Sequence, residues 1–353
     1  MFTAHDTDQL SQLIDIPSAD IRVVIDEISK SEAYESFFIP KANGSKRSIT
    51  APKDLLKKIQ RALIPLLEPL ALPNAVHGFR KGRSIVTAAK LHVGAQAMIS
   101  VDLKNFFHTV TDARVHSALT KSLVPRLVNE TQDLSSEDAP GLIKLITFLC
   151  TYPLDADAKQ DRVLPQGSPC SPYLANLAAR PMDISIRRFL ESVPGNYVYT
   201  RYADDLTISS PHEIDRNLLG ALLQTVHRTG FVVNPDKVSI ASTLRGSPHF
   251  RQKLIVTGLI LDRREGRVRI PRARLDRLRL QLHQAAHVED LEEKTIQSIE
   301  GSISFVHMVY GQLPASIKRA YQRFAETHKR PQLRPGKSRK RARQQSLNPQ
   351  LYT

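Results

Sequence analysis

The chain has 353 residues, of which 41% are hydrophobic and 24% charged, so it has enough apolar material for a core and is neither disordered nor collagen-like in composition. Its formal net charge of +15 favours a nucleic-acid partner over an anionic membrane. The two cysteines, Cys150 and Cys170, form no CxxC pair, and we see neither a membrane span nor a secretory signal, so we expect a cytoplasmic protein with no membrane partner.

The first half of the sequence is predicted to alternate between helices and short strands. Residues 1–40 have a helical pattern. The other elements expected in this half are a short strand at 48–50, a helix over 54–70, a buried strand at 98–101 and a helix over 141–150.

The second half is predicted to contain a hairpin and then a separate helical subdomain. Residues 197–209 carry β-branched and aromatic residues on both sides of an Asp-Asp pair, which favours two strands joined by a turn. Near residue 262 the composition changes, because eight arginines and only three acidic residues lie between Asp262 and Arg279. Helices are expected over 272–286 and 291–310, followed by a flexible basic tail.

Three acidic residues are the candidate catalytic groups. Asp102 ends the apolar strand Ile99-Ser100-Val101, and Asp204-Asp205 lies in the predicted hairpin. Carboxylate oxygens suit Mg²⁺, and three of them at neighbouring strand ends would form a two-metal site for phosphoryl transfer. An ordinary hairpin turn and a solvated strand end are the alternative interpretations.

A proline-rich loop is the third unusual element. It reads Leu164-Pro165-Gln166-Gly167, continues with two further prolines and leads into a helix expected from Tyr173. Gly167 permits a close backbone approach, and the free N–H groups at the helix start suit a phosphate or a base. A loop without function remains the alternative.

In this order and spacing, the three elements resemble the motifs of reverse transcriptases: the first catalytic aspartate, the LPQG loop and the YxDD hairpin. Further segments are similar to the retron-type reverse transcriptases in particular, and the resemblance covers residues 40–325 in all. These segments are residues 47–52, 77–84, 230–237 and 256–258.

The resemblance implies an α+β right-hand polymerase fold with fingers, a palm built on an antiparallel sheet, and a helical thumb. The implied divisions are the N-terminal part of the fingers at 1–96, palm at 97–124, a fingers–palm connection at 125–161, palm again at 162–261, thumb at 262–325 and a basic tail at 326–353.

The resemblance also implies an activity, which is RNA-directed DNA synthesis from dNTPs with two Mg²⁺ ions. For the retron type, the template is a structured noncoding RNA, and priming from a guanosine 2′-hydroxyl gives a branched RNA–DNA product. The implied biology is antiphage defence with an effector protein as partner.

Residue roles follow from the same resemblance. Asp102, Asp204 and Asp205 would be catalytic, and together with the Leu103 carbonyl they would bind the metal ions. Phe107 would exclude ribonucleotides by crowding the 2′ position, and Lys237 would protonate the leaving pyrophosphate. The nucleotide-binding set would be completed by Lys46, Arg47 and Gln166, and the RNA-binding set would be His92, Val256, Thr257, Gly258, Arg272 and Arg279.

The sequence departs from the retron pattern at several positions. Ala88 stands where the family signature before the catalytic strand has Asn, and Asn105, His108 and Cys170 also differ from the usual residues. Other classes remain as alternatives: another bacterial reverse transcriptase (stand-alone defence, diversity-generating or group II intron type), or a catalytically idle RNA-binding scaffold.

Overall fold

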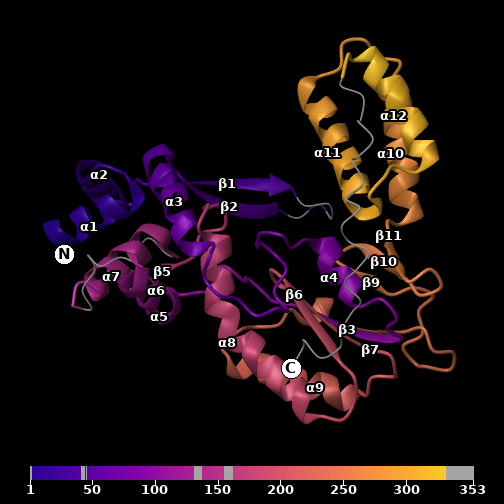
Figure 1. Cartoon of the computed structure of the whole chain (residues 1–353), viewed down its shortest axis with the longest axis horizontal. Helices are drawn as coiled ribbons and strands as arrows, with labels where there is room; N and C mark the ends of the chain where they lie inside the picture. The colour runs from indigo at the N-terminus through magenta and orange to yellow at the C-terminus, as the bar shows by residue number, and fades with distance from the viewer. Residues whose placement is uncertain (1, 41–43, 45, 131–136, 155–161, 331–353) are drawn as a thin grey trace. The chain divides into compact units, whose positions relative to one another are not determined.

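The computed structural model describes residues 2–40, 44, 46–130, 137–154 and 162–330 (Figure 1). The chain divides into two compact units, residues 1–257 and residues 258–353. Both units contain helices and antiparallel strands, so the predicted α+β class is confirmed. Within the described residues, no helix combines the length and the apolar character needed to cross a bilayer.

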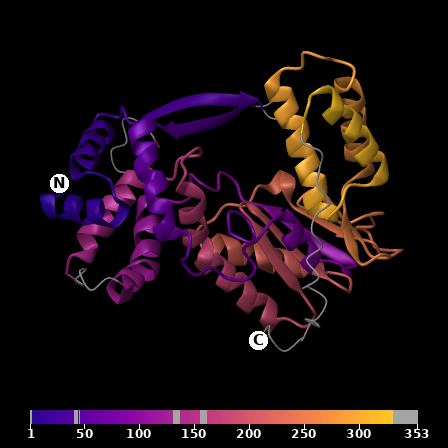
Figure 2. The same cartoon turned by 45° about the horizontal axis from the view of Figure 1, so that its top comes forward.

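The first unit begins with two helices and a long hairpin. Helix α1 (Ala4–Ile14) is followed by α2 (Ser18–Ser29). Strand β1 (Tyr34–Pro40) then pairs antiparallel with β2 (Lys46–Pro52), and Figure 2 shows this hairpin as a long ribbon that projects from the helices of the unit. The short strand predicted at 48–50 lies within β2 and is confirmed.

The prediction of helix throughout residues 1–40 is wrong from Tyr34 onward. Phe37, Phe38 and Ile39 are successive residues of β1, and they are exposed by 44%, 67% and 45%. Because both faces of this strand carry large apolar residues, its sequence lacks the alternation that marks a half-buried strand.

The helices of the first unit pack their apolar faces into a shared core. Helix α3 (Asp54–Leu67) buries Leu56, Ile59 and Leu63, which recur at the predicted helical spacing. Helix α7 (Ala139–Cys150) is buried on most of its surface. The other helical elements are α4 (Ile85–Leu91), α5 (Asp112–Ser122), α6 (Val124–Glu130), α8 (Ser171–Ser192), α9 (Arg216–Arg228) and the 3-10 turn η1 (Pro235–Lys237).

A four-stranded antiparallel sheet positions the candidate site. Its spatial order is β6 (Val198–Tyr202), β7 (Asp205–Ser210), β3 (Ala97–Asp102) and β8 (Ser239–Ser242). Strand β3 lies between β7 and β8 and is buried along nearly its whole length, as predicted for residues 98–101. The predicted hairpin is confirmed as β6 and β7. The short strands of this unit are β4 (Tyr152–Pro153), β5 (Arg162–Val163) and β9 (Ile255–Val256).

The second unit starts with two strands and continues with three helices. Strand β10 (Leu259–Asp262) pairs antiparallel with β11 (Arg267–Arg269), so the prediction of an all-helical subdomain from residue 262 is wrong at its start. In β11 only Val268 is buried, and an exposed arginine lies on each side of it. The charged sequence therefore gives little sign of a strand. Helices α10 (Arg272–Ala285), α11 (Glu293–Tyr310) and α12 (Ala315–Thr327) follow. Beyond residue 330, the predicted basic tail lies outside the described residues.

Candidate active site

The register of the sheet brings the three candidate carboxylates to one end of two neighbouring strands. Asp102 is the last residue of β3 and lies directly opposite Asp205, the first residue of β7. Asp204 precedes Asp205 in the turn, and its carbonyl oxygen accepts a hydrogen bond of 2.9 Å from the Leu103 N–H. Directly paired residues of antiparallel strands have Cα atoms about 5 Å apart, so acids distant in the sequence share one corner of the sheet.

A buried ion pair holds the turn that carries Asp204 and Asp205. The guanidinium of Arg201 donates two hydrogen bonds of 2.8 Å to Asp183 on α8, one of 2.9 Å to the Asn176 side chain, and one of 3.1 Å to the Ala203 carbonyl. Arg201 and Asp183 both have fully buried side chains. Burial lowers the pKa of Arg201, but the negative charge of Asp183 outweighs burial, and the pKa of Arg201 lies above its usual value.

The backbone of the turn is also constrained from the opposite side. Ala203 has a φ of +57°, in the left-handed region that alanine rarely adopts. A Cβ atom on Gly78 would lie 2.6 Å from the Ala203 nitrogen, so only glycine fits there. The sequence-based interpretation missed Arg201 and Asp183, although a lone arginine inside an apolar strand signals a buried partner.

Lys237 lies against the carboxylate corner. Its ammonium group donates a hydrogen bond of 2.8 Å to Asp102, and the Asn234 N–H, just before η1, donates another to the Asp102 carbonyl. The hydrogen bond to Asp102 raises the pKa of Lys237, so the ammonium stays protonated at neutral pH. The structure therefore brings Lys237 together with the acids, and its role toward the leaving pyrophosphate stays a prediction.

The two acids of the turn are held in an environment that disfavours their negative charges. Desolvation, followed by the negative charge of Asp102, raises the pKa of Asp204. Desolvation, followed by the charges of Asp204 and Asp102, raises the pKa of Asp205 to about 6. Added positive charge at this corner would therefore be stabilising.

The donor set fits Mg²⁺ bound together with a substrate. Among the described residues, no three carboxylate, imidazole or thiol groups already converge on a single point as a closed metal cage. Mg²⁺ does not require such a cage, because it usually takes one or two carboxylates and completes its shell with water and substrate phosphates. Hard oxygen donors with mutually repelling charges suit that mode of binding, and Asp102, Asp204, Asp205 and the Leu103 carbonyl are the groups that would hold the metal.

The LPQG loop is tied to the β1–β2 hairpin. The Gln166 carbonyl accepts a 2.9 Å hydrogen bond from the Thr50 N–H, and a Cβ on Gly167 would lie 2.9 Å from the Thr50 carbonyl oxygen. Arg47 lies on β2 close enough for its positive charge to offset part of the rise in the pKa of Asp204. Lys46 is also exposed on β2, with its ammonium group 5.9 Å from the centre of the Phe38 ring.

Two successive phenylalanines after Asp102 have different environments. Phe106 is 4% exposed and packs against Phe231, with ring centres 5.9 Å apart. Phe107 is only partly buried, and its ring lies 6.4 Å from that of Phe79. Of the two, Phe107 is therefore the more exposed side chain, and its contact with a nucleotide stays a prediction.

His92 requires a correction. It is 1% exposed, and its two ring nitrogens form hydrogen bonds of 2.7 Å with the hydroxyl groups of Ser209 and Thr200. A ring enclosed in this way has no surface to offer to RNA, so its role is to join α4 to the sheet. Burial of this kind has no signal in the sequence.

The remaining members of the predicted RNA-binding set are unevenly exposed. Val256 is 1% exposed, so its side chain is also unavailable to RNA, whereas Gly258 is exposed. The Thr257 hydroxyl donates a 3.2 Å hydrogen bond to the Ile85 carbonyl at the start of α4. On α10, Arg272 and Arg279 are exposed and both lie near Asp276, at 3.6 and 3.5 Å. Their role in RNA binding stays a prediction.

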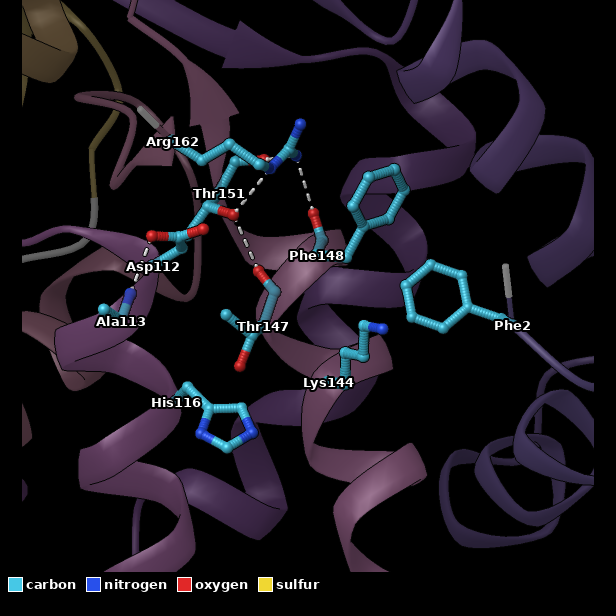
Figure 3. A pocket seen from close by; sticks show the side chains of 9 residues that line it. All are labelled: Phe2, Asp112, Ala113, His116, Lys144, Thr147, Phe148, Thr151 and Arg162. Carbon is cyan, nitrogen blue, oxygen red and sulfur yellow. Dashed lines mark hydrogen bonds between the residues drawn. The ribbon is translucent and has the colours of Figure 1, made fainter. Parts of the chain in front are cut away.

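A pocket of about 290 Å³ lies elsewhere in the first unit, between α5 and α7 (Figure 3). One wall is the Arg162 side chain, which donates hydrogen bonds to the Phe148 carbonyl and to Thr151 and stacks on the Phe148 ring. The pocket is lined by residues other than those of the candidate site: Phe2, Asp112, Ala113, His116, Lys144, Thr147, Phe148, Thr151 and Arg162.

Fold and site together define a class of protein. An antiparallel sheet that carries three aspartates at one end of two neighbouring strands is typical of the right-hand polymerases. Within that class, the chain belongs to the reverse transcriptase (RNA-dependent DNA polymerase) family, whose model matches residues 39–271.

Comparison with curated proteins narrows the family. The retron Mx162 reverse transcriptase of Myxococcus xanthus is 35% identical over 80% of this chain and 59% of its own length. The retron Mx65 enzyme of the same organism is 34% identical over 78% of this chain and 61% of its own length. The retron Ec86 enzyme of Escherichia coli is 28% identical over 77% of this chain and 75% of its own length. The retron-type resemblance is therefore confirmed, while the chain spans about three fifths of the length of the two Myxococcus relatives.

Proposed function

We propose that this protein is an RNA-directed DNA polymerase of the retron type, which copies a structured noncoding RNA into DNA. The observation that carries the proposal is the register that sets Asp102 opposite Asp205, with Asp204 beside it in the turn. The raised pKa values of Asp204 and Asp205 support it, because these acids gain most from a cationic ligand.

The residues around the acids would act on the incoming dNTP. Arg47 and Lys46 on β2 would bind its triphosphate, because a guanidinium suits bidentate phosphate contacts. Gln166 would contact the nucleotide, Phe107 would crowd its sugar, and Lys237 would give a proton to the departing pyrophosphate. When bound, two Mg²⁺ ions would lower the pKa of the attacking hydroxyl and offset charge on the phosphates.

The division into fingers, palm and thumb is part of the proposal. We assign residues 1–96 and 125–161 to the fingers and their connection, and 97–124 with 162–261 to the palm. The sheet formed by β3, β6, β7 and β8 supports this palm. Residues 262–325 would be the thumb, for which the second compact unit gives support.

The finer parts of the proposal follow from the resemblance to the retron type. These parts are priming from a guanosine 2′-hydroxyl, a branched RNA–DNA product, and a role in antiphage defence with an effector protein. A cytoplasmic location is also proposed, and Cys150 and Cys170, which are both free thiols, are consistent with a reducing compartment.

The test uses the nucleic acid that copurifies with the full chain and a primer-extension assay with Mg²⁺ and dNTPs. We expect a short structured RNA joined to DNA, and extension that Asp204→Asn reduces by at least about 10³-fold, because the substitution removes a group that acts on the reacting atoms. The variant should still bind RNA. Normal extension by Asp204→Asn would contradict the proposed site.

Two alternatives give different results in the same experiment. Another class of bacterial reverse transcriptase would copurify with an intron or with untemplated DNA. A catalytically idle scaffold would bind RNA but would not extend a primer.

A further inference from the structure

Phe79 has a backbone conformation that is unfavourable for its residue type. Its φ is +54°, in the left-handed region that glycine and asparagine tolerate and bulky residues avoid. Such strain persists only where the surrounding structure enforces it, and it is concentrated at functional sites. From the sequence, Phe79 is included only as part of segment 77–84 and has no predicted role of its own.

The loop before Phe79 is clamped to the catalytic hairpin. The His77 N–H donates a 2.8 Å hydrogen bond to the Arg201 carbonyl, and the Asn176 side chain donates one of 2.9 Å to the Gly78 carbonyl. Gly78 itself lies against the Ala203 backbone. Just after Phe79, the Arg80 guanidinium bonds the Pro73 carbonyl, so the loop is fixed on both sides of the strained residue.

The conformation places the Phe79 ring between two functional elements. Its centre lies 6.4 Å from the ring of Phe107 and 6.4 Å from the ring of Tyr202, the last residue of β6. Packing into a core does not account for the strain, because Phe79 remains 40% exposed. What the ring gains is contact with the residue that would limit space around the nucleotide sugar.

We propose that Phe79 is a positioning residue of the nucleotide site, which supports the Phe107 ring from the side and so fixes the room left for the sugar. The inference rests on the proposed function. It differs from the steric role of Phe107 itself, because Phe79 acts through Phe107 and not on the nucleotide. Without the Phe79 ring, Phe107 can turn away from the sugar, and a ribonucleotide then fits.

The test measures kcat/KM for a matched deoxyribonucleotide and ribonucleotide in single-nucleotide extension by the full chain. Phe79→Ala should lower the preference for the deoxyribonucleotide by roughly tenfold, the scale of a small change in pocket volume. Phe107→Ala should lower it at least as much, and the double variant should resemble Phe107→Ala, because residues acting through one contact are not additive. Phe79→Tyr, which keeps the ring, should retain the parent preference.

Two further variants guard against a general loss of structure. Phe79→Asn suits the left-handed backbone, so its Tm should equal or exceed that of the parent while its sugar preference falls. Phe250→Ala removes another phenylalanine of the first unit, 43% exposed, and should change nothing. If Phe107→Ala loosens sugar preference and both Phe79→Ala and Phe79→Asn do not, the inference is wrong. Additive effects in the double variant would also overturn it. A parent that does not extend primers would instead refute the proposed function, and this inference with it.

Discussion

The ion pair between Lys237 and Asp102 places an ammonium group at the edge of the carboxylate corner. If this group protonates the departing pyrophosphate, Lys237→Ala should slow nucleotide addition by about 10²–10⁴-fold. The solvent isotope effect of the parent in D₂O should shrink in the variant, because a proton transfer no longer contributes to the barrier. Single-turnover extension in H₂O and D₂O measures both quantities.

The matched control for Lys237 is Lys30, which forms an exposed ion pair of 2.6 Å with Asp26 in α2. Lys30→Ala should leave the rate and the isotope effect unchanged. A slow Lys237→Ala variant with the isotope effect of the parent would show that Lys237 only positions Asp102.

His92 and His77 give the protein a predictable sensitivity to acid. Burial lowers the pKa of each to about 4, so each ring is neutral in the folded protein. In the unfolded chain the ordinary value near 6.5 returns, and the unfolded state binds more protons between these limits. The free energy of unfolding should therefore fall as the pH drops from 6.5 to 4, by up to roughly 3 kcal/mol for each ring.

Denaturant titrations at pH 7 and pH 5 measure this effect. His92→Gln should lose stability at pH 7, since its hydrogen bonds to Ser209 and Thr200 are disturbed, but should show a smaller decrease toward pH 5. His227→Gln, at an exposed position of α9, should keep the pH dependence of the parent. An equal decrease in parent and His92→Gln would mean that another group titrates.

At the scale of elements, helix α8 and the β6–β7 hairpin are joined by the Arg201–Asp183 pair. Asp183→Asn should destabilise the first unit by about 3–5 kcal/mol, because it leaves a buried guanidinium without its counter-charge. Arg201→Met combined with Asp183→Leu should recover much of that stability. Extension activity should stay low in the double variant, since the Ala203 carbonyl has lost its donor.

Thermal unfolding and primer extension, measured on the same preparations, separate stability from positioning. The exposed pair Arg187–Glu191 on α8 is the control, and Glu191→Gln should change stability by less than about 0.5 kcal/mol. Full activity in Arg201→Met with Asp183→Leu would contradict the positioning role.

The elements also show which features can be predicted from sequence. Helix α3 and strand β3 were predictable, because their apolar residues follow the helical period or form a continuous buried run. Strand β1 was not, since Phe37 and Phe38 lie on opposite faces and both are exposed.

For the site, the spacing of motifs predicted that Asp102, Asp204 and Asp205 would meet, and the sheet register agrees. The supporting contacts escaped prediction because they depend on tertiary neighbours. Arg201 on β6 donates hydrogen bonds to Asp183 on α8, and His92 is enclosed by hydroxyl groups from two strands of the sheet.

At the scale of the whole molecule, the net charge of +15 predicts binding to RNA that weakens steeply with salt. Arg272 has a side chain that is 94% exposed, with only a 3.6 Å contact to Asp276, so it is available to a phosphate. Arg272→Gln should weaken RNA binding evenly across sequences and reduce the slope of log affinity against log salt by about one. Filter binding from 50 to 300 mM salt, over which the Debye length falls from about 14 Å to about 6 Å, measures the slope.

Arg330 provides the control in the same unit. Its guanidinium already bonds both oxygens of Glu293, at 2.7 and 2.6 Å, so Arg330→Gln should change the slope less than Arg272→Gln does. A flat salt dependence of the parent would contradict electrostatic binding of the RNA backbone.

The pairing of β3 with β7 has a consequence for how the gene can vary. Side chains alternate between the two faces of a strand, so gaining or losing one codon between Ala97 and Asp102 would turn the terminal acid away from Asp205. Most single amino-acid exchanges in this strand leave that alignment intact. Length changes here should therefore be far rarer among functional descendants than replacements, because the number of codons from Ala97 to Asp102 sets which residue lies opposite Asp205.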